Sequence, residues 1–233
     1  MTPLTVFFAP LESGKTEFVI NDVLPAAKEF GYDSIITVNF SQNKEDPESC
    51  LLQGLTRAYN AIPSIEAKNI PSTLIQFRDF FYLYKILFQE DENAKVLFIL
   101  DEIQILASRD ENDSIVASIR TFLNKNEDWL HCIMTGSNKN ELSRMFNRYE
   151  APLYRAAYIE DFPPLGDAFV LYMIKCYHDK SGLKLDEVGA ISTFNQLGKR
   201  PARFRQLIER MLLQGITDFN IGLGVFSDLA RNK

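Results

Sequence analysis

The chain has 233 residues, 46% of them hydrophobic, and a formal net charge of -6 at pH 7. This length and apolar content support a core large enough for one sizeable domain, or for a main domain with a small appendage. The acidic balance argues against a surface that coats nucleic acid or anionic lipid indiscriminately, so we expect any nucleic-acid contact to be local.

The cysteines and the N-terminal residues indicate a reducing, cytoplasmic location. Cys50, Cys132 and Cys176 lie far apart with no C-x-x-C pair, which favours neither a disulfide framework nor a zinc site. The N-terminus shows no basic segment followed by a long apolar stretch, and no segment reaches the roughly 18 apolar residues that a membrane-spanning helix needs. Neither secretion nor membrane contact is expected.

The first elements follow the order strand, loop, helix. Residues 4–8 form a short apolar run that ends at Ala9-Pro10, which predicts a buried strand entering a turn. A helix is predicted over 15–30, with Gly31 as its stop and Pro25 as a point of kinking or division. Its apolar face is expected to comprise Phe18, Val19, Val23, Ala26, Ala27 and Phe30.

Further strands and helices alternate along the next hundred residues. Apolar, β-branched runs predict strands over 34–40, 95–100 and 130–135. Helices are predicted over 46–59, 73–88 and 115–123, and the two prolines within 62–72 predict a loop. Strands that alternate with helices imply a parallel sheet covered on both faces, which is a three-layer α/β fold.

The pattern changes after Tyr158-Ile159, where only helices are predicted. These helices span 167–177, 185–197 and 201–213. The chain is therefore expected to divide into an α/β core over 1–162 and a small helical lid over 163–233.

Residues 9–16 read Ala-Pro-Leu-Glu-Ser-Gly-Lys-Thr and match G-x-x-x-x-G-K-[ST] with alanine in the first position. In such a loop the backbone N–H groups and the following helix N-terminus face phosphates, the lysine reaches the β and γ oxygens, and the threonine hydroxyl ligates magnesium. The alternative is a tight turn with an incidental lysine. We expect ATP and Mg²⁺ to bind along Ala9, Pro10, Leu11, Glu12, Ser13, Gly14, Lys15, Thr16 and Glu17.

The strand predicted over 95–100 is followed by two carboxylates, Asp101 and Glu102. Ligands bind at the carboxyl ends of strands in open α/β sheets. We expect Asp101 to hold the magnesium and Glu102 to orient and deprotonate the attacking water. Alone, the pair could equally cap the next helix.

One predicted strand, 34–40, separates the two motifs in sequence, and Glu102 directly follows Asp101. This arrangement resembles the additional-strand, catalytic-glutamate division of P-loop proteins, which implies a hydrolase. In AAA+ proteins of that division, a polar "sensor 1" residue at a strand end bonds the attacking water or the γ-phosphate. The best candidate here is Ser137, followed by Asn138 and Thr135. The alternative is a polar strand end that caps the helix at Glu141.

The segments Thr135-Gly-Ser137, Pro152-Leu-Tyr-Arg155 and Phe162-Pro-Pro-Leu165 are similar to the archaeal-type ATPase family within AAA+. The resemblance spans nearly the whole chain. It departs from the pattern in lacking the glycine before Arg155 and most of the segment before the first strand that helps to bind adenine.

The resemblance implies that an arginine acts on the site of an adjacent subunit, so a homo-oligomer or a protein partner is expected. Arg155 is the first candidate, with Arg144 and Arg148 behind it, and the alternative is surface pairing with Glu141 and Glu150. In the lid, Arg203 or Arg200 is expected to reach the γ-phosphate. Together with Lys199 and Arg205 they could instead form a local nucleic-acid patch.

Three classes of function remain open: an ATPase that couples hydrolysis to conformation or partner remodelling, a nucleotide-dependent scaffold with little turnover, and a DNA-associated loader or transposition-type regulator. Other chemistries find little support. His131 and His178 lack neighbours in zinc-ligand spacing, and Cys132 lies within an apolar strand. The aromatic residues of 77–88 are expected in the core, with part of them available for a subunit contact.

Overall fold

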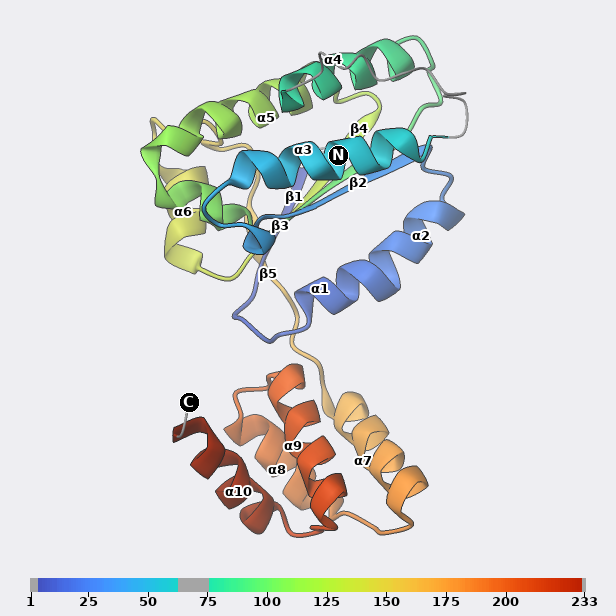
Figure 1. Ribbon diagram of the computed structural model, residues 1–233, viewed down its shortest axis with the longest axis vertical. Helices are drawn as coiled ribbons and strands as arrows, with labels where there is room; N and C mark the ends of the chain where they lie inside the picture. The colour runs from blue at the N-terminus through green and yellow to red at the C-terminus, as the bar shows by residue number, and fades with distance from the viewer. Residues whose placement is uncertain (1–3, 63–75, 232–233) are drawn as a thin grey trace. The chain divides into compact units, whose positions relative to one another are not determined.

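The computed structural model describes residues 4–62 and 76–231, and these contain a five-stranded parallel sheet flanked by helices (Figure 1). The strand order is β2-β3-β4-β1-β5, and every neighbouring pair is parallel. The predicted α/β class with a parallel central sheet is confirmed. The strands are β1 (Leu4–Phe8), β2 (Ser34–Asn39), β3 (Val96–Asp101), β4 (Leu130–Gly136) and β5 (Ile159–Asp161).

Helices cover both faces of the sheet. Because successive side chains of a strand point to opposite faces, each strand contributes to a core on either side. Along β3, Val96, Phe98 and Leu100 enter the larger core, whereas Leu97 and Ile99 enter a smaller one. Figure 1 shows α3 (Pro47–Asn60), α4 (Phe77–Phe88) and α5 (Asp113–Lys125) over one face and α1 (Lys15–Phe18) and α2 (Leu24–Glu29) over the other. α6 (Lys139–Asn147) follows β4.

The helix predicted over 15–30 is interrupted by a π-helical segment, Val19–Val23, between α1 and α2. The Leu24 N–H bonds to the Val19 carbonyl, and Pro25, which has no N–H, follows at once. A π turn accommodates the hydrogen bond that proline removes. Phe30, expected on the apolar face, is instead 72% exposed, because the helix has already ended at Glu29.

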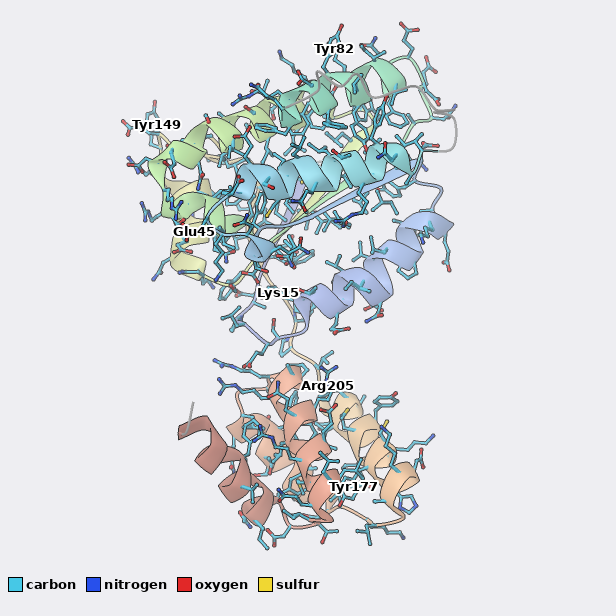
Figure 2. The ribbon with its side chains drawn as sticks, in the orientation of Figure 1. Lys15, Glu45, Tyr82, Tyr149, Tyr177 and Arg205 are labelled. Atoms are coloured by element: carbon cyan, nitrogen blue, oxygen red, sulfur yellow. The ribbon has the colours of Figure 1, made fainter. Side chains whose placement is uncertain are left out.

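The aromatic residues of α4 form much of the larger core, as expected. Phe81 stacks on Phe122 of α5 with ring centroids 4.1 Å apart, and Tyr84 is fully buried. Tyr82 lies on the other side of the helix and is exposed (Figure 2). The predicted loop at 62–72 and the predicted helix start at Thr73 fall mainly within 63–75, outside the described residues.

The chain divides into two compact units: the residues before Leu11 with Lys15–Phe162, and Leu11–Gly14 with the residues from Pro163 onward. The second unit contains α7 (Asp167–Ser181), α8 (Glu187–Gln196), α9 (Pro201–Gln214) and α10 (Phe219–Arg231). These helices share their own core, in which Phe204 is fully buried and the Tyr177 hydroxyl donates to the Ile216 carbonyl.

Among the elements that were not predicted from the sequence are β5 and α10. β5 has only three residues at the edge of the sheet, too few for a recognisable alternation of apolar and polar residues. α10 begins five residues after α9 ends, in a stretch for which no helix was predicted. In the described part of the chain, no helix is both long enough and apolar enough to cross a membrane.

Candidate functional site

The loop Ala9–Thr16 connects the end of β1 to the start of α1, where Figure 2 labels Lys15. Gly14 has a φ of +94°, a backbone conformation that glycine adopts without strain. Ala9 is not among the residues with positive φ, and its N–H donates to the Gly136 carbonyl at 3.2 Å. The first position of the motif therefore does not need a glycine here.

Lys15 is 5% exposed and is bonded to its own loop. Its Nζ donates to the Ala9 carbonyl at 2.7 Å and to the Pro10 carbonyl at 3.2 Å, and it lies 3.7 Å from Glu102 Oε1. Burial lowers the pKa of Lys15, while the Glu102 and Asp101 carboxylates oppose that effect by favouring the charged ammonium. The ammonium thus lies between the loop and the end of β3.

Asp101 is the last residue of β3, and its carboxylate accepts hydrogen bonds from three polar side chains of three other elements. Thr16 Oγ1 donates to Asp101 Oδ2 at 2.9 Å, and Asn39 Nδ2 at the end of β2 donates to the same oxygen at 3.1 Å. Thr135 Oγ1 of β4 donates to Asp101 Oδ1. Because these strands are parallel, their carboxyl ends meet at one edge of the sheet.

Glu102 has a left-handed backbone, with φ 59° and ψ 41°, which is strained for a residue with a side chain. Its Oε2 accepts hydrogen bonds from Gln104 Nε2 at 2.6 Å and from Ser137 Oγ at 2.5 Å. Ser137 therefore lies beside the carboxylate expected to activate water.

Two residues at this edge were not identified from the sequence, Asn39 and Gln104. Asn39 directly follows an apolar strand, and Gln104 stands two positions after Glu102. A signal existed for Asn39, since polar residues at the ends of parallel strands meet at the same edge. Gln104 lies in the 3-10 helical segment Ile103–Ser108, whose course the sequence pattern does not indicate.

Asn138, a candidate for sensor 1, instead caps α6. Its Oδ1 accepts from the N–H groups of Asn140 at 3.1 Å and Glu141 at 3.3 Å. This geometry corresponds to the capping alternative for the polar strand end. Glu17, which follows the loop Ala9–Thr16, is exposed and accepts a hydrogen bond from Asn21 Nδ2 at 2.9 Å.

The candidate arginines of the first unit are exposed, and Arg148 and Arg155 contact residues near them in sequence. Arg148 lies 3.5 Å from Glu150, one of the surface pairs considered for it. Arg155 has a φ of +53°, and its guanidinium lies 5.1 Å from the Tyr154 ring centroid. Arg144 and Arg148 line a cavity of about 280 Å³ together with Asp110 and other residues.

Residues Leu11–Gly14 of this loop group with the C-terminal helices in the second unit. Within that unit, Arg203 Nε donates to Glu12 Oε2 at 2.6 Å, and Arg200 Nη1 lies 3.7 Å from the same oxygen. The two arginines expected to reach a γ-phosphate thus share one carboxylate of the loop.

No family profile and no curated protein matches this sequence. Solved structures match in fold. The Walker-type ATPase of Pyrococcus abyssi has a TM-score of 0.71 at 18% identity, over 99% of this chain and 68% of its own length. The ORC2 protein of Aeropyrum pernix, solved in ADPNP and ADP complexes, has a TM-score of 0.60 at 16% identity, over 98% of this chain and 62% of its own.

The chain shares the three-layer α/β fold of these structures. DnaA of Aquifex aeolicus bound to AMPPCP is a further match, with a TM-score of 0.56, 16% identity, and coverage of 98% of this chain and 60% of its own. The chain thus spans about two thirds of the ATPase and about 60% of the ORC2 and DnaA chains. In the sheet, β4 lies between β1 and β3. β2, which lies between the two motifs in sequence, is at the edge of the sheet.

Proposed function

We propose that the chain binds ATP with Mg²⁺ and hydrolyses it, using Lys15, Thr16, Asp101 and Glu102. The observation that carries the proposal is their convergence: Thr16 bonds Asp101 at 2.9 Å, and Lys15 lies 3.7 Å from Glu102. A phosphate loop joined to two strand-end carboxylates can hold a triphosphate, a metal ion and a water together. Nucleotide binding also fits the nucleotide-bound structures that share this fold.

The residues present suit a magnesium ion and a phosphate. The Thr16 hydroxyl and the Asp101 carboxylate supply oxygen ligands, which Mg²⁺ prefers. Within the described residues, Ser13 Oγ is buried in the phosphate loop without a hydrogen-bond partner, and a phosphate oxygen would satisfy it. The N–H groups that begin the helix over 15–29 have no acceptor within that helix. Bound Mg²⁺ would neutralise charge on the phosphate oxygens.

Each side chain then has a distinct role. Lys15 exchanges the Ala9 and Pro10 carbonyls for phosphate oxygens, which compensate its charge better than neutral carbonyls do. Glu102 orients a water and accepts its proton. Ser137, whose Oγ donates a hydrogen bond to Glu102, is proposed to contact the same water or the γ-phosphate.

A second copy of the chain or another protein is proposed to complete the site with an arginine, for which Arg155 remains the first choice. Arginines stabilise the charge that develops during phosphoryl transfer. Arg155 is exposed and makes a cation–π contact with Tyr154, so it is available to a neighbour. Arg203 is proposed to leave Glu12 when the γ-phosphate competes for it.

An alternative is a nucleotide-dependent, DNA-associated regulator with little hydrolysis of its own. Two structures that share the fold favour it, the ORC1 protein of Aeropyrum pernix in complex with DNA and a DnaA bound to AMPPCP and single-stranded DNA. This alternative predicts ATP-dependent, salt-sensitive DNA binding without phosphate release.

Phosphate release by the wild type and by Glu102→Gln, with and without DNA, tests the proposal. Glu102→Gln should keep its ATP affinity while turnover falls by roughly 10²–10⁴-fold, because only the water-activating carboxylate is lost. Glu187→Gln, at an exposed position of α8, is the control and should leave turnover unchanged. Equal turnover in Glu102→Gln and wild type would falsify the role of Glu102, and ATP-dependent DNA binding without turnover would favour the alternative.

A further inference from the structure

Gln104 is a buried polar residue, 5% exposed, whose amide contacts two residues of the proposed site. Its Nε2 donates to Glu102 Oε2 at 2.6 Å and to Ser137 Oγ at 3.2 Å. Its Oε1 accepts from the Ser137 N–H at 3.3 Å. Glu102, Gln104 and Ser137, here called the Glu102 cluster, thus form a closed set of hydrogen bonds between the end of β3 and the end of β4.

The space for this amide depends on Gly136, the last residue of β4. A Cβ added at Gly136 would lie 2.8 Å from Gln104 Oε1 and 2.7 Å from a methyl carbon of Leu142. Gly136 is not among the glycines with positive φ, so the position requires glycine for space and not for backbone freedom. The Gly-Ser pair at the end of β4 therefore accommodates Gln104. Gly136 leaves space for the Gln104 amide, and Ser137 hydrogen-bonds to that amide.

The Glu102 cluster also determines which oxygen of Glu102 faces the phosphate loop. Oε2 accepts from both Gln104 and Ser137, whereas Oε1 is the oxygen 3.7 Å from Lys15 Nζ. When Lys15 contacts phosphate, Oε1 is left to accept a proton from water. A carboxylate held in one orientation avoids the cost of reorganisation during the reaction.

We propose that Gln104 is a positioning residue that holds the Glu102 carboxylate and Ser137 in one arrangement, with Glu102 Oε1 directed at the proposed phosphate site. Its consequence for turnover rests on the proposed ATPase function. Gln104 itself contacts neither nucleotide nor water in the reaction. The strained backbone of Glu102 agrees with this role, since such conformations persist where the surrounding contacts impose them.

Gln104→Met keeps the length of the side chain and removes its donors and acceptor. It should lower kcat by about 10–100-fold, the usual range for residues that orient a catalytic group, with ATP affinity within about twofold of wild type. Gln53→Met is the matched control, because Gln53 is exposed on α3 and its amide contacts only Ser49 in the described structure; this variant should keep kcat. Unchanged kcat in Gln104→Met would overturn the proposal, as would an equal loss of ATP affinity, which a general structural defect would produce.

Gly136→Ala tests the same arrangement with Gln104 intact, because the new methyl group displaces the Gln104 amide. It should reproduce the kcat loss, and the double variant with Gln104→Met should be no slower than the slower single variant. If the fold-losses in kcat of the two single variants multiplied in the double variant, the two residues would act independently, which would contradict the proposal.

The arrangement can be tested without turnover, which separates its failure from failure of the proposed function. In ¹H–¹⁵N spectra, the side-chain amide of Gln104, assigned by its loss in Gln104→Met, should exchange with solvent far more slowly than that of Gln53. If the Gln104 amide exchanged slowly in a protein that releases no phosphate, the arrangement of the Glu102 cluster would be supported and the proposed ATPase function would be rejected. Equally fast exchange at both residues would reject the Glu102 cluster whatever the turnover.

Discussion

The Thr16 hydroxyl donates a hydrogen bond to Asp101 Oδ2 at 2.9 Å, although the two residues are 85 positions apart in the chain. Thr16 follows β1 and Asp101 ends β3, and β4 lies between these strands in the sheet. The contact therefore requires the full parallel arrangement and is not a local feature of either motif. Two oxygen atoms at this distance are suited to sharing one hard cation.

Asp101→Asn should remove the magnesium-dependent part of ATP binding. Asparagine has a similar shape, but the loss of the carboxylate charge should weaken ATP binding in Mg²⁺ by at least about tenfold, with little change in EDTA. Fluorescent ATP-analogue titrations in the two buffers measure this difference. Asp91→Asn, in an exposed turn after α4, is the control. An undiminished magnesium effect in Asp101→Asn would exclude Asp101 as a ligand.

Stability should fall as the pH drops below about 6.5, the ordinary pKa of histidine, partly because of His131. Burial, and to a smaller extent Lys95, lowers the pKa of the His131 imidazole, and its Nδ1 is a buried atom without a partner in the described structure. The unfolded chain then binds the proton more readily than the folded one, so acid favours unfolding from the ordinary pKa down to the lowered one.

His131→Phe should reduce this acid-dependent loss of stability while it keeps an aromatic ring against Tyr32. In the structure the His131 and Tyr32 rings pack edge to face, with their centroids 5.8 Å apart. Urea denaturation at about pH 7.5 and about pH 5.5, on either side of the ordinary histidine pKa, measures the loss. His178→Phe provides the comparison at an exposed position of α7. A loss as large in His131→Phe as in wild type would contradict this assignment.

Gly54→Ala should destabilise the protein, because α3 packs closely on β2 at this residue. An added Cβ would lie 2.6 Å from Val38 Cγ2 and 2.7 Å from the Thr37 carbonyl oxygen. Overpacking of this kind costs about 1–3 kcal/mol. Gly224→Ala in α10 has nothing within 4 Å of the new methyl group and should instead stabilise its helix by about 0.5–1 kcal/mol. Chemical denaturation of both variants measures the contrast, and destabilisations of equal size would contradict it.

Much of the fold could be predicted because its strongest signals are local. The apolar run that became β3 is buried at every residue, as a strand of a parallel sheet covered by helices on both faces is. The runs that became β1 and β4 consist of buried and partly buried residues. The position of Asp101 and Glu102 at a strand end, and of Lys15 at a helix start, followed from the same patterns. In the structure, Lys15 lies 3.7 Å from Glu102 Oε1, at the same edge of the sheet as Asp101.

The remaining features depend on contacts that no local pattern encodes. Gln104 enters the site because a 3-10 segment follows β3 and because Gly136 leaves room for its amide. Pro25 cannot donate a helical hydrogen bond, and the π-helical segment before it accommodates this loss. The sequence shows where the proline lies, but not how the helix adjusts to it. Phe30 continued the helical spacing, yet the helix ended one residue earlier and left it exposed.

The most direct test of the account is calorimetric titration of the wild type and of Lys15→Ala with ATP in the presence of Mg²⁺. We predict saturable binding by the wild type and its loss in Lys15→Ala, because the buried ammonium is the cation proposed to meet the β and γ oxygens. Lys28→Ala, exposed on α2, should bind as the wild type does. Equal ATP affinity in wild type and Lys15→Ala, or no binding by the wild type, would contradict the central claim.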